Sequence, residues 1–354
     1  TITPRLIFIS YRLRSACRLQ RIQGHVMSTK AGSEVLFEKV GNAGVITLNR
    51  PKALNALNLT MIRHIYPQLK KWDKDSETDL VIIKGAGDKG FCAGGDIRAI
   101  TEAGKAGDSL TQDLFREEYI LNNTIGTYQK PYVALIDGIT MGGGVGLSIH
   151  GRFRVATEKT LFAMPETGIG KRQPVFLSPC GFIICLTRQI VSLEKDLVDL
   201  KSPSNSDVAQ LLDSYQEQSC LDAEKPFVLQ EQTEAIDRLF SAGSVEEIME
   251  NLKKDGSAFA LKQTETLAKM SPTSLKLTFR QIQEGARMSL QAVLVMEYRL
   301  SQACMRGNDF YEGVRAVLID KDQSPKWKPS TLSGVSEQAI EECFSSLGER
   351  DLKL

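Results

Sequence analysis

Two glycine-rich turns, each directly after a short apolar run, most constrain what this chain can fold into. FCAGGDI at 91–97 follows DLVIIKG at 79–85, and MGGGVG at 141–146 follows KPYVALIDGIT at 130–140. Such turns either connect a strand tightly to a helix, or present unpaired N–H groups that bind an oxyanion or a phosphate. Two of them in one domain suggest a reacting carbonyl group held by two amides.

Strands and helices are expected to alternate through the first half of the chain. The pattern predicts a strand hairpin over 35–49 with its turn near Gly41, then a helix in which apolar residues recur at helical spacing over 61–69. Strand, glycine turn and helix recur twice more, with strands at 80–84 and 132–136. This alternation predicts an α/β core.

Composition divides the chain into three regions. Residues 1–33 contain no acidic residue and alternate arginine with apolar residues, which is typical of a mitochondrial transit peptide, with a disordered basic leader as the alternative. Residues 34–200 are expected to form the α/β core, and 171–193 stands out as an altered stretch within it. Residues 201–354 are charged and amphipathic at helical period, which predicts a mostly helical region.

The overall composition argues against several classes of partner. The 44 basic and 43 acidic residues leave a net charge of +1, which gives no electrostatic support for nucleic-acid binding. No apolar run reaches the length of a membrane span. The seven cysteines are scattered without a CxxC pair, so neither a disulfide framework nor a zinc site is indicated.

Two short motifs resemble known sites but lack a part that the chemistry needs. GAGDKG at 85–90 formally matches a dinucleotide-binding pattern, yet the residues after it are a poor helix start, so the pyrophosphate would have no helix N-terminus. GLSIH at 146–150 lacks the last glycine of a nucleophile elbow, because His150 stands there. We expect this stretch to pack a helix onto the sheet.

Four longer motifs together resemble the crotonase superfamily in order and spacing. They are LNRPKALNAL (48–57), GFCAGGDI (90–97), GITMGGGVGL (138–147) and FAMPETGIG (162–170). Their form, with the later MSPTSLKLT and EGVRAVLIDKDQSPKW, is similar to the 3-hydroxyisobutyryl-CoA hydrolases of valine breakdown.

This resemblance implies a crotonase-like spiral of strand-strand-helix repeats with a mostly helical C-terminal region. It implies hydrolysis of an acyl-CoA thioester, 3-hydroxyisobutyryl-CoA, in the mitochondrial matrix, without a metal or redox cofactor. It is compatible with a homo-oligomer.

The resemblance also implies roles for particular residues. Gly95 and Gly143 match the two oxyanion-hole donors, and Glu118 matches an acid that contacts the substrate. Glu166 matches a catalytic acid that attacks the thioester or activates water; the alternative is an acidic residue that only stabilises a helix N-terminus. The residues that fall where relatives hold coenzyme A are Lys52, Ala53, Leu54, Gly94, Asp96 and Ile97.

The chain departs from the family pattern at two catalytic positions. Gly146 replaces one of the two glutamates of the hydratases, so the hydratase pair is incomplete. The hydrolases carry an aspartate shortly after the catalytic glutamate, but Pro174 takes its place and 167–193 contains no acidic residue. This stretch is also shorter than in the family, and the apolar run at 180–185 is expected to lack a partner surface and to favour aggregation.

Three functions therefore remain open from the sequence. The first is the hydrolase, impaired by the loss of its second acid. The others are a different acyl-CoA hydratase or isomerase, and a non-catalytic CoA-thioester binder or defective isoform.

Overall fold

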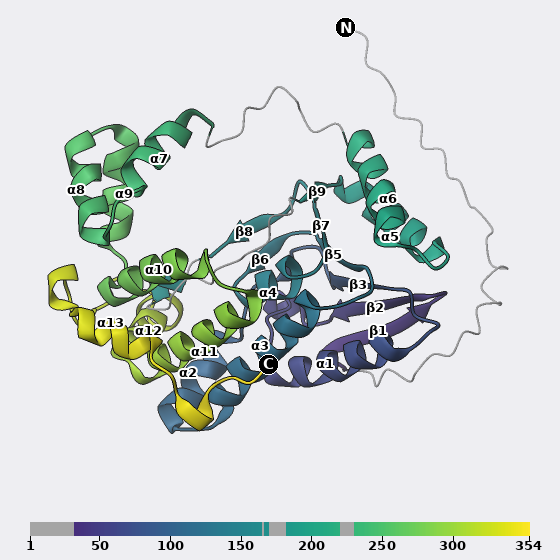
Figure 1. The fold of residues 1–354 in the computed structure, drawn as a ribbon, viewed down its shortest axis with the longest axis horizontal. Helices are drawn as coiled ribbons and strands as arrows, with labels where there is room; N and C mark the ends of the chain where they lie inside the picture. Colours follow the sequence, from purple (N-terminus) through teal and green to yellow (C-terminus); the bar gives the residue numbers. More distant parts are fainter. Residues whose placement is uncertain (1–31, 165, 170–181, 220–229) are drawn as a thin grey trace, which may run out of the picture.

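The computed structural model describes residues 32–164, 166–169, 182–219 and 230–354. Its nine strands form one sheet of six and one of three (Figure 1). In spatial order, the larger sheet contains β1 (Val35–Val40), β2 (Ala43–Leu48), β3 (Leu80–Gly85), β5 (Tyr132–Ile136), β7 (Phe153–Ala156) and β9 (Ile183–Ile184). The smaller sheet contains β4 (Gly90–Cys92), β6 (Ile139–Met141) and β8 (Leu161–Ala163). Only β1 and β2 pair antiparallel, through the predicted hairpin turn.

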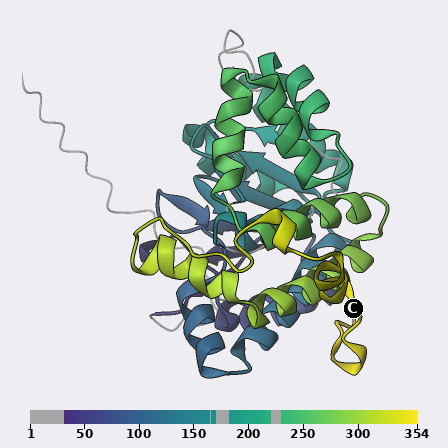
Figure 2. The same cartoon turned by 90° about the vertical axis from the view of Figure 1, so that its left-hand side faces the viewer.

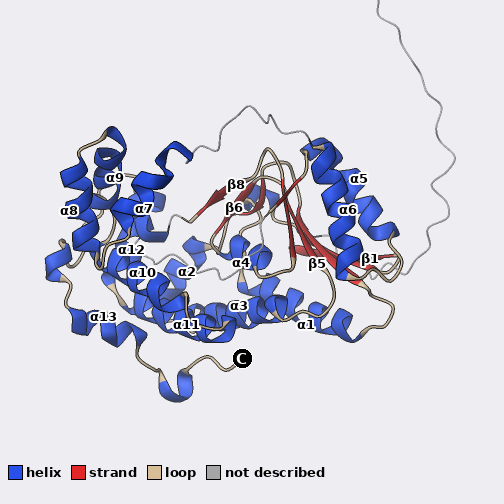
Figure 3. Cartoon of the chain, turned by 45° about the horizontal axis from the view of Figure 1, so that its top comes forward, coloured by secondary structure: helices blue, strands red, loops and turns tan. Residues whose placement is uncertain are grey.

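A strand-strand-helix unit repeats along the first half of the chain. β3 and β4 lead into α2 (Ile97–Ala106), β5 and β6 into α4 (Gly143–Ile149), and β7 and β8 into the 3-10 turn η2 (Glu166–Ile169). In each unit the first strand joins the larger sheet and the second joins the smaller one. Figure 3 shows β6 and β8 side by side, with β5 in the larger sheet. The fold class expected from the sequence is thereby confirmed.

Alternating side chains of the larger sheet contact helices on its two faces. Ile46 and Ile83 pack with α1 (Leu59–Lys74) and α3 (Leu110–Gly126) on one face. Val45 and Ile82 pack on the other face with α5 (Ile190–Asp199) and α6 (Asn205–Gln218) (Figure 1). All four side chains are buried. Helix α6 thus packs on the sheet, although it lies beyond residue 200.

The described residues after β9 contain helices but no strand, as predicted. Figure 2 shows these helices, in green to yellow, over one side of the molecule. Besides α5 and α6, they are α7 (Thr233–Phe240), α8 (Val245–Asp255), α9 (Ala258–Ala268), α10 (Pro272–Gly285), α11 (Leu290–Arg306), α12 (Asn308–Val314) and α13 (Glu337–Phe344). Helices α7 to α9 share a small apolar cluster, against which Phe279 of α10 also packs, whereas α10, α11, α12 and α13 contribute to the main core.

Part of the altered stretch is integrated into the larger sheet. Ile183 and Ile184 form β9 beside β7, and Cys185 is fully buried with its N–H donating to the carbonyl of Ala156 at 2.9 Å. The expectation that this apolar run lacks a partner surface is therefore wrong for these three residues, because β7 offers an open edge to pair with. Residues 1–31 and 170–181 lie outside the described ranges, and Pro174 belongs to the second of these segments.

Candidate active site

The two glycine-rich turns meet in space because β4 and β6 are neighbours in the smaller sheet. Gly94 has a φ of +94°, which side-chain-bearing residues rarely adopt. A Cβ atom on it would stand 3.1 Å from the carbonyl oxygen of Met141, so the two backbones approach closely. The structure thus brings together the pair of turns from which the sequence suggested a carbonyl site.

The two predicted oxyanion donors differ in their local setting. Gly143 is the first residue of α4, where helix geometry leaves the N–H without an intrahelical acceptor. Gly95 lies in a short parallel bridge, in which Leu57 N–H donates to Gly94 and Asp96 N–H donates to Leu57. These bonds fix the turn without using the Gly95 N–H. Both glycines line the same cavity, described below.

Two carboxylates flank the start of α4. Glu118, on α3, and Glu166, the first residue of η2, are 8% and 7% exposed. A Cβ atom on Gly143 would stand 2.5 Å from Glu118 Oε1, and one on Gly142 would stand 3.1 Å from Glu166 Oε1. Two buried acids thus approach one helix end from different elements.

A cavity of about 70 Å³ joins these groups. Its lining is otherwise mostly apolar, with Ile97, Ile100, Leu114, Phe115 and Met141. The same cavity is lined by Gly94, Gly95, Gly143, Glu118 and Glu166. An amide pair and two carboxylates in a mostly apolar setting can polarise a carbonyl group and deliver a nucleophile to it.

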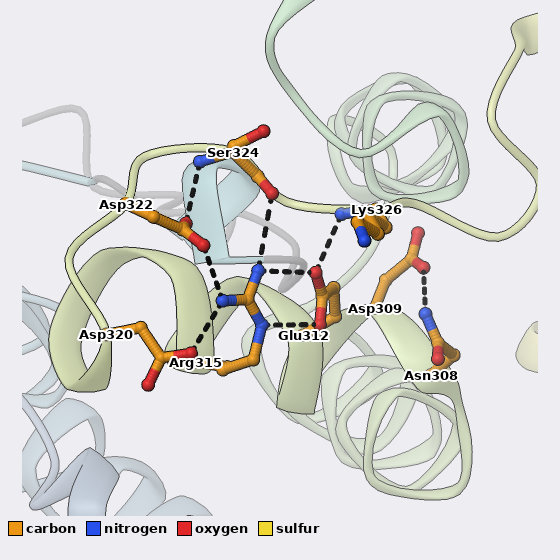
Figure 4. A network of polar contacts seen from close by, with 8 residues as sticks. All are labelled: Asn308, Asp309, Glu312, Arg315, Asp320, Asp322, Ser324 and Lys326. Carbon is orange, nitrogen blue, oxygen red and sulfur yellow. Dashed lines mark hydrogen bonds and ion pairs between the residues drawn. The ribbon is translucent and has the colours of Figure 1, made fainter.

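Helix α12 supports the turn that carries Glu166, because α12 packs against η2. An arginine at the end of this helix holds the following segment in place (Figure 4). Arg315 donates two bonds to Glu312, at 2.9 and 2.8 Å, and one each to Asp320 and Asp322, both at 2.7 Å. Glu312 also accepts from the Lys326 N–H at 2.8 Å.

The same contacts shift the protonation of this network. The bonds from Arg315 and from the Lys326 N–H lower the pKa of Glu312 to about 2. Bonds to Glu312 and then to the two aspartates raise the pKa of Arg315. Glu312 and Arg315 therefore stay charged at neutral pH, and their bonds tie the segment that follows α12 to this helix.

The residues predicted to hold coenzyme A are distributed over two cavities. Gly94 and Ile97 line the cavity described above. Lys52 and Leu54 line another of about 240 Å³, which includes the residues from 86 to 90, and Ala53 is exposed beside them.

Asp96, the remaining member of that set, has a structural partner. Its carboxylate caps the N-terminus of α2 and forms an ion pair with Arg50 at 2.9 Å. Its predicted contact would therefore come from the backbone.

Two residues that sequence reasoning missed fix the loop between β2 and α1. Arg50 also pairs with Glu34 at 3.0 Å and donates to the Ala56 carbonyl. Asn55 is fully buried, and its amide donates to the carbonyls of Ala86 and Gly90, at 2.9 and 2.8 Å. Both lie inside the LNRPKALNAL motif, and membership of this motif is the sequence signal that could have indicated their role. Their partners are distant in sequence.

The structure explains why the two rejected motifs are not sites. GAGDKG at 85–90 runs into strand β4 and not into a helix. Ser148 of GLSIH lies within α4, and its hydroxyl donates to the Gly144 carbonyl at 3.0 Å. His150 is half-buried, and its desolvation, followed by repulsion from Arg154, lowers its pKa to about 4. A sharp, exposed nucleophile turn is absent at this point.

Other nucleophile and metal chemistry finds little support in the described ranges. Burial raises the pKa of the Cys92 thiol to about 12, so it stays protonated beside the glycine turn. The described residues contain no cluster of three or more histidine, cysteine or acidic side chains that could hold a metal ion. None of the helices within those ranges is both long and apolar enough to span a bilayer.

Gly146, which replaces a hydratase glutamate, is closely packed. A Cβ atom on it would stand 2.8 to 3.2 Å from the amide group of Asn122, which is 5% exposed. A larger side chain does not fit here unless Asn122 moves.

Comparison with known proteins identifies the family. The family model described as enoyl-CoA hydratase/isomerase matches residues 43–178 and 180–344. A Danio rerio protein named 3-hydroxyisobutyryl-CoA hydrolase, mitochondrial, is 78% identical over 379 positions, with 99% of each chain covered. The Homo sapiens protein of the same name is 58% identical, with 92% of each chain covered.

Two solved structures with related names share the fold of this chain. A carnitinyl-CoA dehydratase from Mycobacterium thermoresistibile has a TM-score of 0.81 at 31% identity, covering 90% of this chain and 98% of its own. An enoyl-CoA hydratase from Rhodobacter sphaeroides has a TM-score of 0.79 at 33% identity, covering 91% and 100%.

The alignment also supports a shortened segment. It has 379 positions whereas the chain has 354 residues, so at least 25 positions have no residue of this chain. The family model breaks at residue 179, inside the stretch at 171–193.

The order of motifs, the paired glycine turns and the near-complete coverage agree. This chain belongs to the enoyl-CoA hydratase/isomerase family and, within it, to the 3-hydroxyisobutyryl-CoA hydrolases.

Proposed function

We propose that this chain hydrolyses the thioester of 3-hydroxyisobutyryl-CoA to 3-hydroxyisobutyrate and CoA, in valine breakdown. The observation that carries the proposal is the single cavity lined by Gly95, Gly143, Glu118 and Glu166. The names of its close relatives support the choice of substrate.

In the proposed reaction, the thioester oxygen accepts hydrogen bonds from the N–H groups of Gly95 and Gly143. Each such donor is worth about 2.7–4 kcal/mol in acyl chemistry, because negative charge develops on the oxygen in the transition state. The Glu166 carboxylate either attacks the carbonyl carbon or takes a proton from the water that does. On the water route, a carbon–oxygen bond forms as Glu166 takes the proton, the carbon–sulfur bond breaks, and that proton passes to the sulfur of the departing CoA. On the direct route, the carbon–sulfur bond breaks as Glu166 forms an anhydride; water then cleaves the anhydride, which restores the carboxylate and supplies the proton to the CoA thiolate.

We assign the remaining residues to binding. Glu118 would accept a hydrogen bond from the substrate beside the oxyanion hole. The backbone around Lys52, Ala53 and Leu54 would contact the coenzyme A portion, as would Gly94, Asp96 and Ile97. The reaction as proposed needs only these groups and water, without a metal or redox cofactor.

A second candidate is a CoA-thioester binder that does not turn its ligand over. Two observations favour it: residues 167–193 contain no acidic residue that could serve as the family's second acid, and the match to the family model is interrupted at residue 179, within that stretch. The first leaves Glu166 without its family partner, which would lower the rate even if binding remained.

Two measurements on the same sample separate these candidates. Release of free thiol from 3-hydroxyisobutyryl-CoA reports hydrolysis, and calorimetry reports binding of the same compound. Binding with thiol release supports the hydrolase, and binding alone supports the non-catalytic binder. Incubation with a crotonyl thioester, followed at the absorbance of its double bond, tests hydration, which Gly146 makes the weakest candidate.

We further propose the mitochondrial matrix as the compartment, since the relatives are named mitochondrial. Protease protection in intact and ruptured mitochondria would distinguish the matrix from the outer compartments. A homo-oligomer is also proposed, and light scattering of the purified chain tests it.

A further inference from the structure

A second cavity, of about 170 Å³, lies where the N-terminal end of α3 meets α11 and the last 3-10 turn, η7 (Gly348–Arg350). It shares no lining residue with the cavity at the glycine turns. Its polar lining includes Asp108, Thr111, Tyr298, Gln302, Arg306 and Arg350. We propose that this cavity binds a small oxyanion, a phosphate or a carboxylate, at a site separate from the thioester.

Two positive charges at this cavity lack a carboxylate partner. Arg306 ends α11 and Arg350 ends η7, and neither forms an ion pair with any residue that the structure describes. Arg299, two turns earlier on α11, shows the contrast, because it pairs with Asp351 at 2.5 Å. A guanidinium group presents donors in a fork that matches phosphate and carboxylate oxygens.

The N-terminus of α3 adds favourable electrostatics. This helix has 17 residues, and Ser109 at its N-cap makes no side-chain hydrogen bond to a backbone N–H of the first turn, because its hydroxyl donates to the Asp113 carboxylate at 3.4 Å. Asp108 accepts from the Leu110 N–H at 2.8 Å, and Thr111, one residue further on, lines the cavity. The positive end of the helix dipole therefore faces the cavity with its first turn only partly capped.

Gln302 gives independent evidence for a missing hydrogen-bond acceptor at this cavity. Its side chain is 6% exposed and lines the cavity, and its Nε2 has no hydrogen-bond partner within the described ranges. A buried amide donor without an acceptor is unfavourable, and such groups are normally satisfied by protein, water or ligand. An oxyanion oxygen would supply that acceptor once the amide turns toward the cavity.

Size and charge limit the ligand to a small anion. A volume of about 170 Å³ is below that of ordinary drug-sized ligand sites. The carboxylate of Asp108 opposes an anion, so the two arginines leave a surplus of one positive side-chain charge. The cavity therefore suits a short carboxylate or a singly charged phosphate better than a nucleotide.

Calorimetry on the full chain at low ionic strength tests the proposal with two probes, inorganic phosphate and acetate. We expect at least one to bind with a stoichiometry of one, and the tighter of the two identifies the source of the oxyanion. Arg306→Gln and Arg350→Gln should each weaken binding about tenfold or more, because each removes a charged hydrogen bond. Gln302→Leu should weaken it as well.

Arg287→Gln is the matched control, since Arg287 is exposed and does not line this cavity. It removes the same charge and should leave the affinity unchanged. Thermal unfolding by circular dichroism checks that each variant is folded.

Three results would overturn the proposal. The first is no binding of either probe at millimolar concentration, and the second is equal affinity in the wild type and the double arginine variant. The third is displacement of the bound probe by saturating CoA, which would place it in the thioester site.

Discussion

The carboxylate of Glu118 lies directly against the backbone of Gly143, so that a Cβ atom on Gly143 would stand 2.5 Å from Glu118 Oε1. The two residues belong to α3 and α4, which pack against each other. The amide predicted to hold the thioester oxygen thus lies beside a buried acid, and only a glycine allows this approach.

Gly143→Ala should lower kcat/KM by about tenfold or more, because the new methyl group displaces Glu118 and the geometry that it sets. Gly95→Ala is a matched control in the other donor, since its Cβ would meet only Ile100 Cδ1, at 3.4 Å. Thiol-release kinetics on both variants test this difference. Equal losses in the two variants would contradict the role of the Glu118 contact.

Gly146→Glu should not create a hydratase, because Asn122 occupies the space that the new side chain needs. We expect this substitution to reduce the free energy of unfolding by about 1–3 kcal/mol through overpacking. Asn122→Ala in the same chain should recover part of the loss. Urea unfolding of the two single variants and the double variant measures the coupling, and strictly additive effects would argue against the contact.

Much of this fold could be predicted from the sequence because its signals are local. The hairpin at Gly41 and the amphipathic helix over 61–69 have clear periods, and the structure contains both. The smaller sheet could not be read in this way, because β4, β6 and β8 have only three residues each, too few to show a period.

The candidate site likewise contains residues that local motifs predict and residues that they do not. Gly95, Gly143, Glu118 and Glu166 came from motifs within short segments, and the structure gathers them in one cavity. Arg50 could not be recognised as the residue that ties Glu34 to Asp96, because its ion pairs join three distant segments. The pairing of β9 was missed for a similar reason, since nothing in Ile183 and Ile184 themselves indicates the open edge of β7.

His150 should make stability depend on pH between about 6.5 and 4. Its pKa falls from 6.5 to about 4 on folding, because burial and then Arg154 disfavour the charged ring. Above pH 6.5 the ring is neutral in both states and the contribution is fully present. As pH falls toward 4 the unfolded state takes up the proton first, so stability drops by up to about 3 kcal/mol.

Urea unfolding at several pH values tests this dependence as a difference between variants. His150→Gln should flatten the profile in that window. His64→Gln, at an exposed position of α1, should leave the slope unchanged. A wild-type slope retained in His150→Gln would rule out the assignment.

Arg315→Gln should lower kcat more than it changes KM. Without the bonds to Glu312, Asp320 and Asp322, helix α12 loses its anchor and the Glu166 turn that packs on it shifts. A misplacement of this kind can reduce the rate by up to about a hundredfold. Arg315→Lys should not restore activity, because one ammonium group cannot replace the guanidinium fork.

Arg238→Gln provides the control, since it breaks an ion pair with Asp255 in the α7 and α8 region, away from the Glu166 turn. It should leave kcat unchanged. A loss of kcat equal to that of Arg315→Gln would mean that general destabilisation explains both.

The central claim is that Glu166 acts as the nucleophile or general base of thioester hydrolysis. Thiol release by the wild type and by Glu166→Gln tests it most directly. Calorimetric binding of 3-hydroxyisobutyryl-CoA is measured on both proteins. We expect release by the wild type and a loss of about a hundredfold or more in the variant, with affinity nearly unchanged. Equal release by both proteins, or binding without release by the wild type, would contradict it.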